Sequence, residues 1–265
     1  MPDHAQKTRS AFAEHPDYRV RFEPCAKRVR VMASGTAVAD TTRVRLMRET
    51  GHVPVYYFPR DDLRMDLLER SDHRTFCPFK GTASYWHVTQ GADRRENAVW
   101  SYETPFEEVA QIKDYMAFYW NRMDAWLEEE EEVFVHARDP QVRIDVLNSK
   151  RRVQVTLGGE VVADTTSACF LFETGLPVRY YIPRGDVRAA LLEPSDTVTA
   201  CPYKGRAAYH SLRVGGTHYR DIVWHYPEPV QEASKIKGLL CFFNEKVDSI
   251  RVDGKVVAKP QTKWS

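Results

Sequence analysis

Two lysines occupy matching turns of this chain and are its clearest candidates for chemistry. Lys80 lies in residues 77–81 and Lys204 in residues 201–205, and both stretches read Cys-Pro-x-Lys-Gly. Proline presets the turn, and glycine accepts the positive φ with which a following strand can begin. A lysine held at a strand end beside backbone N–H groups can bind a carboxylate or a phosphate. The alternative is that Lys80 and Lys204 are solvated turn residues.

Aromatic residues recur at predicted strand positions in both halves of the chain. An apolar pocket edged by a few polar groups is the usual form of a small-molecule site, although a plain aromatic core would explain the same residues. Arg60 and Arg184, each directly after a proline, would edge such a pocket as partners for an anion. The recurring aromatic residues are Tyr57, Tyr85 and Trp100 in the first half and Tyr181, Tyr209 and Trp224 in the second.

The cysteines of the two turns, Cys77 and Cys201, offer a second kind of chemistry. A nearby lysine can lower the pKa of a thiol, and His52 or His87 would supply a base. Neither histidine is matched by a histidine in the second half of the chain. We therefore favour Cys77 and Cys201 as packing residues at the wall of the predicted pocket. The nine histidines show no metal-ligand spacing, so we expect no metal site and no cofactor.

These residues belong to a domain that occurs twice in the chain, with matching residues 124 positions apart. Residues 49–51 read Glu-Thr-Gly, as do residues 173–175, and the correspondence extends through almost the whole chain. We place the first repeat at residues 18–132 and the second at residues 133–257. The five consecutive glutamates at 128–132 are interpreted as a solvated connector between the repeats.

Alternating apolar and polar residues predict that each repeat is mostly antiparallel β. In the first repeat we expect a hairpin around Gly35, strands at 43–48 and 53–58, and a second hairpin formed by 82–88 and 97–102. Proline begins a short helix predicted over residues 60–68. A longer helix is predicted to close the repeat, because its apolar residues follow helical spacing: Val109, Ile112, Met116, Tyr119, Met123 and Trp126. The expected fold class is mainly β (α+β), with two similar domains and a C-terminal helix in each.

The composition limits the classes of partner. The net charge of +1 gives no strong field for nucleic acid or for an anionic membrane surface. Five cysteines, an odd number, make a poor disulfide framework and suit a reducing compartment. The charged N-terminal stretch lacks the apolar centre of a signal peptide, and no apolar run approaches the ~20 residues that cross a bilayer. We expect a soluble cytoplasmic protein that binds neither nucleic acid nor membrane.

Several of these residues resemble those of a known family, the domain of unknown function 427 (DUF-427), in its tandem two-copy form. The resemblance covers residues 18–257. It is carried in the first copy by Tyr57-Phe58-Pro59, Asp62, Leu68, Ser71, Thr75, Cys77-Pro78, Lys80-Gly81, Ala83 and Tyr85, and in the second by Tyr181-Ile182-Pro183, Asp186, Leu192, Ser195, Thr199, Cys201-Pro202, Lys204-Gly205, Ala207 and Tyr209.

This resemblance implies a fold similar to the β-tent, in which two antiparallel sheets lean together over a small-molecule pocket. It also carries a nucleotidyltransferase label, which no catalytic motif in this sequence supports. Many β-tent relatives hold zinc with four cysteines, whereas this chain has one matched cysteine per repeat, so we expect no structural zinc.

Three hypotheses for function follow from the residues. The first is a tandem binding protein for a small polar or anionic molecule, with one aromatic and lysine-lined pocket in each repeat. The second is a group-transfer enzyme, similar to a nucleotidyltransferase, in which one repeat is active. The third is an interaction scaffold that uses the glutamate run and the C-terminal tail. We rank them in this order, and the sequence alone does not decide whether the protein is an enzyme.

Overall fold

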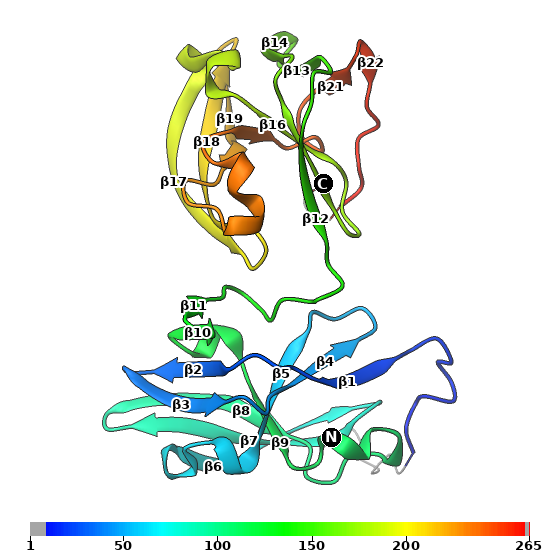
Figure 1. Cartoon of the computed structure of the whole chain (residues 1–265), viewed down its shortest axis with the longest axis vertical. Coiled ribbons are helices and arrows are strands. Elements are labelled where there is room, and N and C mark those ends of the chain that lie inside the picture. The colour runs from blue at the N-terminus through cyan, green and yellow to red at the C-terminus, as the bar shows by residue number, and fades with distance from the viewer. Residues whose placement is uncertain (1–8, 263–264) are drawn as a thin grey trace. The chain divides into compact units, whose positions relative to one another are not determined.

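The computed structural model describes residues 9–262 and residue 265, and the chain divides into two compact units, Met1–Asp139 and Pro140–Ser265. We call these units repeat one and repeat two. Each contains one seven-stranded and one four-stranded antiparallel sheet (Figure 1). Among the described residues, every strand pairs within its own repeat. The protein is therefore mainly β and consists of two similar antiparallel domains, as the duplication predicted.

Repeat one contains the following strands and 3-10 turns (η): β1 (Val20–Pro24), β2 (Val29–Ala33), β3 (Thr36–Thr41), β4 (Arg45–Glu49), β5 (Val55–Pro59), η1 (Arg60–Asp62), η2 (Met65–Leu67), β6 (Leu68–Cys77), β7 (Gly81–Gln90), β8 (Asp93–Ser101), η3 (Glu107–Ile112), β9 (Tyr115–Phe118), η4 (Trp120–Arg122), β10 (Ala125–Glu128) and β11 (Glu131–Glu132). Its large sheet has the order β1-β4-β5-β9-β8-β7-β6, and its small sheet has the order β11-β10-β2-β3.

Repeat two follows the same order with β12 (Ile144–Asn148), β13 (Val153–Leu157), β14 (Glu160–Thr165), β15 (Cys169–Glu173), β16 (Arg179–Ile182), η5 (Arg184–Asp186), η6 (Ala189–Leu191), β17 (Leu192–Cys201), β18 (Gly205–Val214), β19 (Thr217–His225), η7 (Gln231–Ile236), β20 (Leu240–Phe242), β21 (Ser249–Val252) and β22 (Lys255–Val256). Its sheets have the orders β12-β15-β16-β20-β19-β18-β17 and β14-β13-β21-β22.

The predicted closing helix is wrong in both repeats. In repeat one the segment forms η3, β9, η4 and β10 in succession, and β9 lies in the middle of the large sheet between β5 and β8. Met116 pairs with Phe58, and Ala117 pairs with Trp100. Backbone pairing with two neighbours therefore outweighs the helical spacing of the apolar residues. The short helix predicted over residues 60–68 is likewise two 3-10 turns, η1 and η2, which lead into β6.

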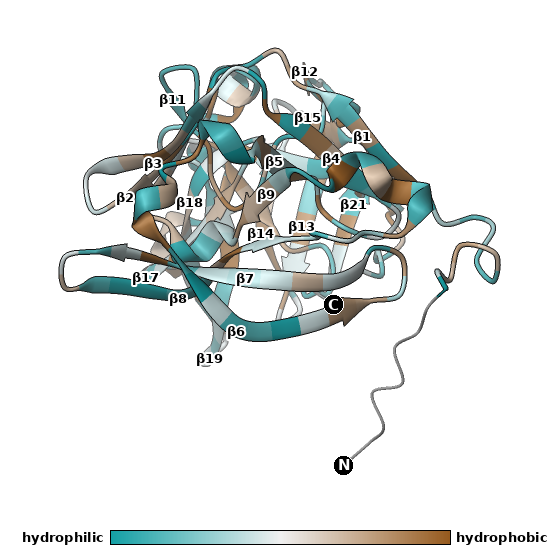
Figure 2. Cartoon of the chain, turned by 90° about the horizontal axis from the view of Figure 1, so that it is seen from below, coloured by the Kyte–Doolittle hydropathy of each residue, from teal (hydrophilic) through white to brown (hydrophobic). Residues whose placement is uncertain are grey.

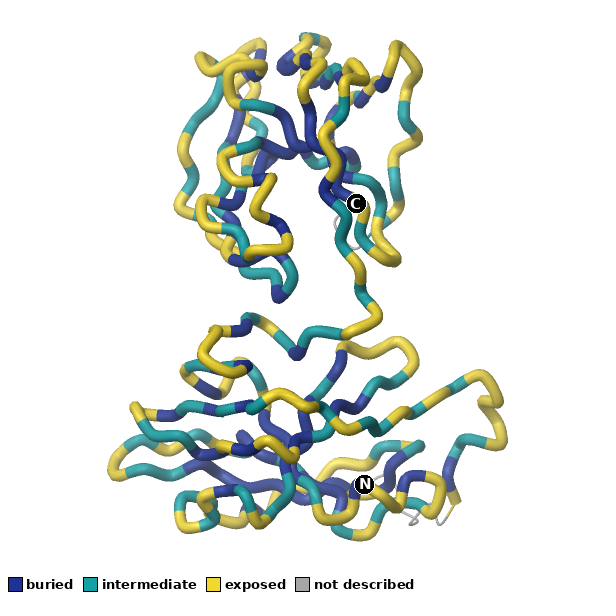
Figure 3. Tube along the Cα trace, viewed as in Figure 1, coloured by how far each residue is buried: buried dark blue, intermediate teal, exposed yellow. Residues whose placement is uncertain are grey.

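Each large sheet carries an apolar layer on both faces. In β5 of repeat one, Tyr56 and Phe58 face the small sheet, while Tyr57 faces the opposite side, as the alternation of a strand requires. Buried residues accordingly follow the strands inside each repeat (Figure 3). The edge strand β6 is largely hydrophilic along its length (Figure 2), and charged side chains protect an edge strand from pairing with other chains. The aromatic residues of interest belong to the face away from the small sheet.

The glutamate run is exposed from Glu129 to Glu132, as predicted, but it is not a simple connector, because it ends one strand and forms the next. Glu128 is buried at the end of β10, where it accepts a hydrogen bond from Tyr56 Oη at 2.7 Å and pairs with Lys27. Glu131–Glu132 forms β11, which pairs with β10. Since an uncompensated buried carboxylate is costly, the partners Tyr56 and Lys27 explain how Glu128 is accommodated. The run is part of the small sheet of repeat one.

Candidate functional site

The lysine of the first Cys-Pro-x-Lys-Gly turn is buried and paired. Lys80 lies between β6 and β7, and Glu49 is the last residue of β4. The Lys80 Nζ atom lies 2.5 Å from both carboxylate oxygens of Glu49, and Lys80 is only 7 % exposed. Tyr18 also donates its hydroxyl hydrogen to Glu49. The ammonium is therefore neither solvated nor available as an uncompensated positive charge.

Repeat two reproduces this pair. Lys204 Nζ donates to Glu173 Oε2 at 2.5 Å, and Lys204 is 8 % exposed. Glu173 ends β15, as Glu49 ends β4. Sequence reasoning missed both glutamates as partners of the lysines. The signal was present, because each glutamate begins the Glu-Thr-Gly stretch that recurs in the two repeats.

The glycine of each turn is required by the backbone. Gly205 has a φ of +98°, and a Cβ atom there would lie 3.0 Å from the backbone oxygen of Glu228. The next chain segment also holds the turn, since the N–H of Val230 donates to the carbonyl of Lys204 at 3.2 Å. Positive φ and close backbone approach both favour glycine. The turn therefore fixes the lysine backbone before its side chain reaches the glutamate.

In repeat one, the segment before β1 packs on the lysine turn. The Tyr18 ring stacks on Phe79 with centroids 3.6 Å apart, and Phe12 meets the same ring edge-on at 5.2 Å. The N–H of Ala11 donates to the carbonyl of Pro78 at 2.9 Å. These contacts leave Phe79 half-buried, whereas Pro78 of the same turn is exposed and Lys80 is buried.

In each repeat, most of the sequence-predicted site residues meet in a cluster on the face of the large sheet that lies away from the small sheet. In repeat one, Trp100 Nε1 donates to Tyr57 Oη at 3.3 Å, and the Tyr85 and Thr75 hydroxyls are hydrogen bonded at 2.7 Å. Cys77 packs against the same cluster. Lys80 joins it through the ring of Tyr102, whose centroid lies 5.9 Å from Nζ, although Tyr102 was not among the predicted residues.

The corresponding cluster in repeat two keeps the same contacts. Trp224 Nε1 donates to Tyr181 Oη at 3.2 Å, and the hydroxyls of Tyr209 and Thr199 are 2.8 Å apart. Cys201 packs at its side. We refer to these two groups, which centre on Tyr57 and Tyr181, as the aromatic clusters.

Arg60 and Arg184 do not belong to the aromatic clusters. The Arg60 guanidinium lies 5.5 Å from the ring centroid of Trp86 and 3.7 Å from Glu103. Trp86 belongs to the core on the side of the small sheet, so Arg60 is on the opposite face of β7 from Tyr85. Arg184 lies 3.3 Å from His210. The expectation that these arginines edge the pocket therefore does not match their positions.

Burial keeps the tyrosines of the clusters protonated. It is the main cause that raises the pKa of Tyr57 and of Tyr181, and the indole N–H bond to each hydroxyl opposes this rise. Burial also raises the pKa of Cys241, a residue of the second cluster, to about 12. At neutral pH the clusters hold neutral phenols and a neutral thiol, which are hydrogen-bonding groups without charge.

The rims of the two clusters differ. In repeat one Tyr119 lies 4.6 Å from Trp100 between ring centroids and is 40 % exposed. Burial and a hydrogen bond with Tyr85 raise the pKa of Tyr119 to about 12. In repeat two, Phe243 takes the place beside Trp224 at 4.5 Å. The first cluster therefore presents a more accessible polar ring.

A buried ion pair closes the rim of repeat two. Arg179 donates to both carboxylate oxygens of Glu245 at 2.7 and 2.8 Å, and its guanidinium lies 5.5 Å from the Trp224 ring centroid. The Glu245 side chain is fully buried. Burial alone would raise its pKa, but hydrogen bonds from Arg179 and Thr262 outweigh burial and lower it to about 2. Repeat one has Val55 and Asn121 at the matching positions, 124 residues earlier.

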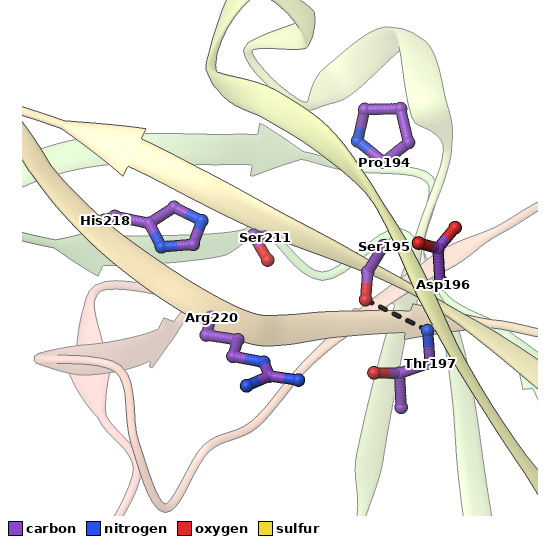
Figure 4. A pocket seen from close by; sticks show the side chains of 7 residues that line it. All are labelled: Pro194, Ser195, Asp196, Thr197, Ser211, His218 and Arg220. Atoms are coloured by element: carbon purple, nitrogen blue, oxygen red, sulfur yellow. Dashed lines mark hydrogen bonds between the residues drawn. The ribbon is translucent and has the colours of Figure 1, made fainter.

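A polar hollow of about 450 Å³ lies elsewhere in repeat two, at a bulge in β17 (Figure 4). Ser195 accepts a hydrogen bond from the backbone N–H of Thr197 at 3.1 Å and donates to Asp221 at 2.5 Å. Thr197 donates to the other Asp221 oxygen at 2.8 Å. None of the sequence-predicted site residues lines this hollow. Its lining residues are Pro194, Ser195, Asp196, Thr197, Ser211, His218 and Arg220.

The described part of the chain has neither a cluster of metal-ligating residues nor a membrane-spanning helix. No group of three or more His, Cys, Asp or Glu residues within it has an arrangement that could hold a metal ion. Likewise, no described helix has the length and apolar character needed to span a membrane.

These features define a class of protein: a tandem duplication of an antiparallel-β domain in which a glutamate at the end of β4 or β15 binds the lysine of a Cys-Pro-x-Lys-Gly turn. The family model for the domain of unknown function DUF427 matches residues 21–129 and, a second time, residues 145–253. The chain therefore belongs to the DUF427 family, in the two-copy form that the sequence resemblance implied. No curated protein matches the chain.

Proposed function

We propose that each repeat is a small-molecule-binding module and that the ligand lies against the aromatic cluster. The observation that carries this proposal is the buried Lys80–Glu49 pair and its copy, Lys204–Glu173, each beside an indole-to-phenol hydrogen bond. A buried ion pair is weak evidence for stability, because apolar residues of similar volume often stabilise a fold as well. Its presence in both copies therefore supports a role in recognition.

The charge balance of the site favours a neutral ligand. Glu49 already neutralises Lys80, and Glu173 neutralises Lys204, so the expectation of an anion at these lysines loses its physical basis. Neutral phenols and indoles remain to form hydrogen bonds and ring contacts. We propose a flat, uncharged molecule with hydrogen-bonding groups at its edge, such as a heteroaromatic ring.

Repeat one is the better candidate for binding. Tyr119 is 40 % exposed and lies next to Trp100, whereas Arg179 and Glu245 occupy the matching region of repeat two. Since ligand sites combine an apolar wall with a few polar groups, we propose that the ring of the ligand packs on Trp100 and Tyr119. Its polar edge would meet the hydroxyl of Tyr85.

The test is a thermal-shift screen with neutral heteroaromatic compounds and their carboxylated analogues. A neutral compound that stabilises the wild type is expected to lose most of its effect in Tyr119→Ala. Phe76→Ala is the matched control, because Phe76 is 43 % exposed and its ring contacts Phe106 rather than Trp100 or Tyr119. A compound whose shift is lost equally in both variants, or a preference for the carboxylated analogues, would contradict the proposed site.

The described residues add no observation in favour of a group-transfer enzyme. His52 lies in the exposed turn between β4 and β5, and His87 Nδ1 accepts a hydrogen bond from the backbone N–H of Asn97 at 3.0 Å. These were the two bases considered for Cys77. Binding remains the first-ranked function.

Two broader proposals accompany this function. We propose that the antiparallel sheets of each repeat are arranged as in the β-tent proteins. All five cysteines carry free thiols, which supports the proposal that the protein works in the reducing cytoplasm.

A further inference from the structure

A second cluster of chemically capable residues lies in repeat two, on the opposite face of β18 and β19 from its aromatic cluster. The rings of His210 and His225 stack with centroids 5.1 Å apart and an interplanar angle of 12°. Arg184, from η5, places Nη1 3.3 Å from His210 Nε2. His225 pairs across the strands with Ala208, which has a small side chain.

The same place in repeat one shows what has changed. There Arg60 faces Glu103, which also accepts hydrogen bonds from Arg70 at 2.5 Å and from Ser84 at 2.8 Å. The carboxylate therefore compensates the arginines. Trp86 fills the position that corresponds to His210.

Repeat two has an arginine, Arg184, at the position of Arg60, but it has no acid at the position of Glu103. Pro227 stands where repeat one has Glu103, and Ala208 stands where it has Ser84. Within residues 9–262 and 265, Arg184 forms no ion pair with a carboxylate. An arginine and two imidazoles therefore share one face without a carboxylate to balance them, an arrangement suited to an anion from outside.

The groups that face the two histidines come from four elements. Arg184 comes from η5 and His225 from β19, and Arg206 lies on the same face of β18 as Ala208 and His210 because side chains alternate along a strand. From β17, the backbone of Glu193 acts to raise the pKa of His210, while the Glu193 carboxylate pairs with Arg213 at 2.7 Å.

Burial first, and then the neighbouring charges, lowers the pKa of both histidines. For His210 the second cause is Arg184, and for His225 the causes after burial are His210 and Arg184. Both rings are consequently neutral at neutral pH. A bound anion would reverse the effect of Arg184 and favour the protonated rings.

We propose that Arg184, His210 and His225 form a binding site for a small tetrahedral oxyanion, inorganic phosphate or the phosphoryl group of a monoester. The guanidinium would donate two N–H groups to the anion, and each protonated imidazole would donate one. Binding takes up protons from solution, because the imidazoles become charged when the anion arrives. This site is separate from the aromatic clusters and does not depend on the function proposed for them.

The first test uses calorimetry with sulfate, whose charge is constant between pH 5.5 and 7.5. Because each proton taken up changes the binding constant by about tenfold per pH unit, sulfate should bind more tightly at pH 5.5 than at pH 7.5. Arg184→Gln should weaken binding by about tenfold or more. The matched control is Arg60→Gln in repeat one, which should leave binding unchanged because Arg60 is compensated by Glu103. Equal affinity at both pH values, or equal losses in the two variants, would overturn the proposal.

A second measurement needs no variant. The ring nitrogen signals of His210 and His225 in the wild-type protein are followed by NMR while inorganic phosphate or glycerol phosphate is added. The pKa values of His210 and His225 should both rise on binding. Tighter binding of glycerol phosphate would identify a monoester as the preferred source of the anion. Tighter binding of inorganic phosphate would identify the free ion. Histidine signals that do not respond to either compound would refute the site.

Discussion

Replacing Lys80 by methionine tests the central physical statement, that the lysine of the turn is held by a buried charge pair. The variant removes the cation and leaves the Glu49 carboxylate, whose side chain is 10 % exposed, with the Tyr18 hydroxyl as its remaining partner. Removing one member of a buried pair costs about 3–5 kcal/mol. Because Tyr18 still donates to Glu49, we expect the lower end, a loss of about 3 kcal/mol in the free energy of unfolding of repeat one.

The assay is urea denaturation followed by circular dichroism and tryptophan fluorescence, fitted with one transition for each repeat. The double variant Lys80→Met, Glu49→Gln removes both charges and should cost about 1 kcal/mol, since no uncompensated ion remains. Glu49→Gln alone leaves the ammonium buried and should cost about 3 kcal/mol. Each single variant should therefore lose much more free energy of unfolding than the double variant.

Lys113→Met provides the matched control, because Lys113 is exposed just after η3. A surface change of this kind should stay within about 0.5 kcal/mol. The reasoning is refuted if Lys80→Met is as mild as Lys113→Met. It is also refuted if the double variant costs the sum of the two single changes, since the residues would then not interact.

Three further predictions use the same denaturation assay. Gly205→Ala should lower the free energy of unfolding by about 2 kcal/mol, because the φ of Gly205 is +98° and the added Cβ would lie 3.0 Å from a backbone oxygen. Gly51→Ala, where the added Cβ has no atom within 4 Å, should lower it by about 1 kcal/mol. Equal losses in the two variants would contradict this prediction. Tyr57→Phe removes the acceptor of an indole N–H and should cost about 1 kcal/mol, so an unchanged midpoint would count against the bond. The pKa of Glu245 is held at about 2 in the folded protein, below its unfolded value of 4.5, so its contribution of about 3 kcal/mol is present above pH 4.5 and is lost as the pH falls toward 2. Changing Arg179→Val together with Glu245→Asn should flatten this acid dependence, and parallel curves for variant and wild type would refute the assignment.

The hairpins and the duplication could be predicted from the sequence because their signals are local. The turn at Gly35 joins β2 and β3, as the alternating residues on each side indicated. The segment from Val109 to Trp126 was wrongly predicted to be a helix, because 3-10 turns and short buried strands space its apolar residues almost as a helix would. Which structure forms there depends on pairing with β5 and β8, and such partners are distant in sequence.

The candidate site could be predicted only in part. The aromatic residues and the lysines were found because each recurs 124 positions later. The partner of Lys80 was not found, since Glu49 lies 31 residues away and only the folded sheet brings the end of β4 to the β6–β7 turn. The place of Arg60 was also missed, because the face of β7 that it contacts depends on the path of η1.

The self-contained pairing of the strands has a consequence for how the two copies can be separated and compared. A cut between Asp139 and Pro140 would interrupt no ladder of backbone hydrogen bonds among the described strands. Each half would keep all of its strand partners, so the two aromatic clusters could be compared in separately produced halves, and the proposed oxyanion site would belong to the second half alone. Mutational drift in one copy would also leave the scaffold of the other intact, which explains how one half could retain an acid such as Glu103 while its twin accepted a proline at the same place.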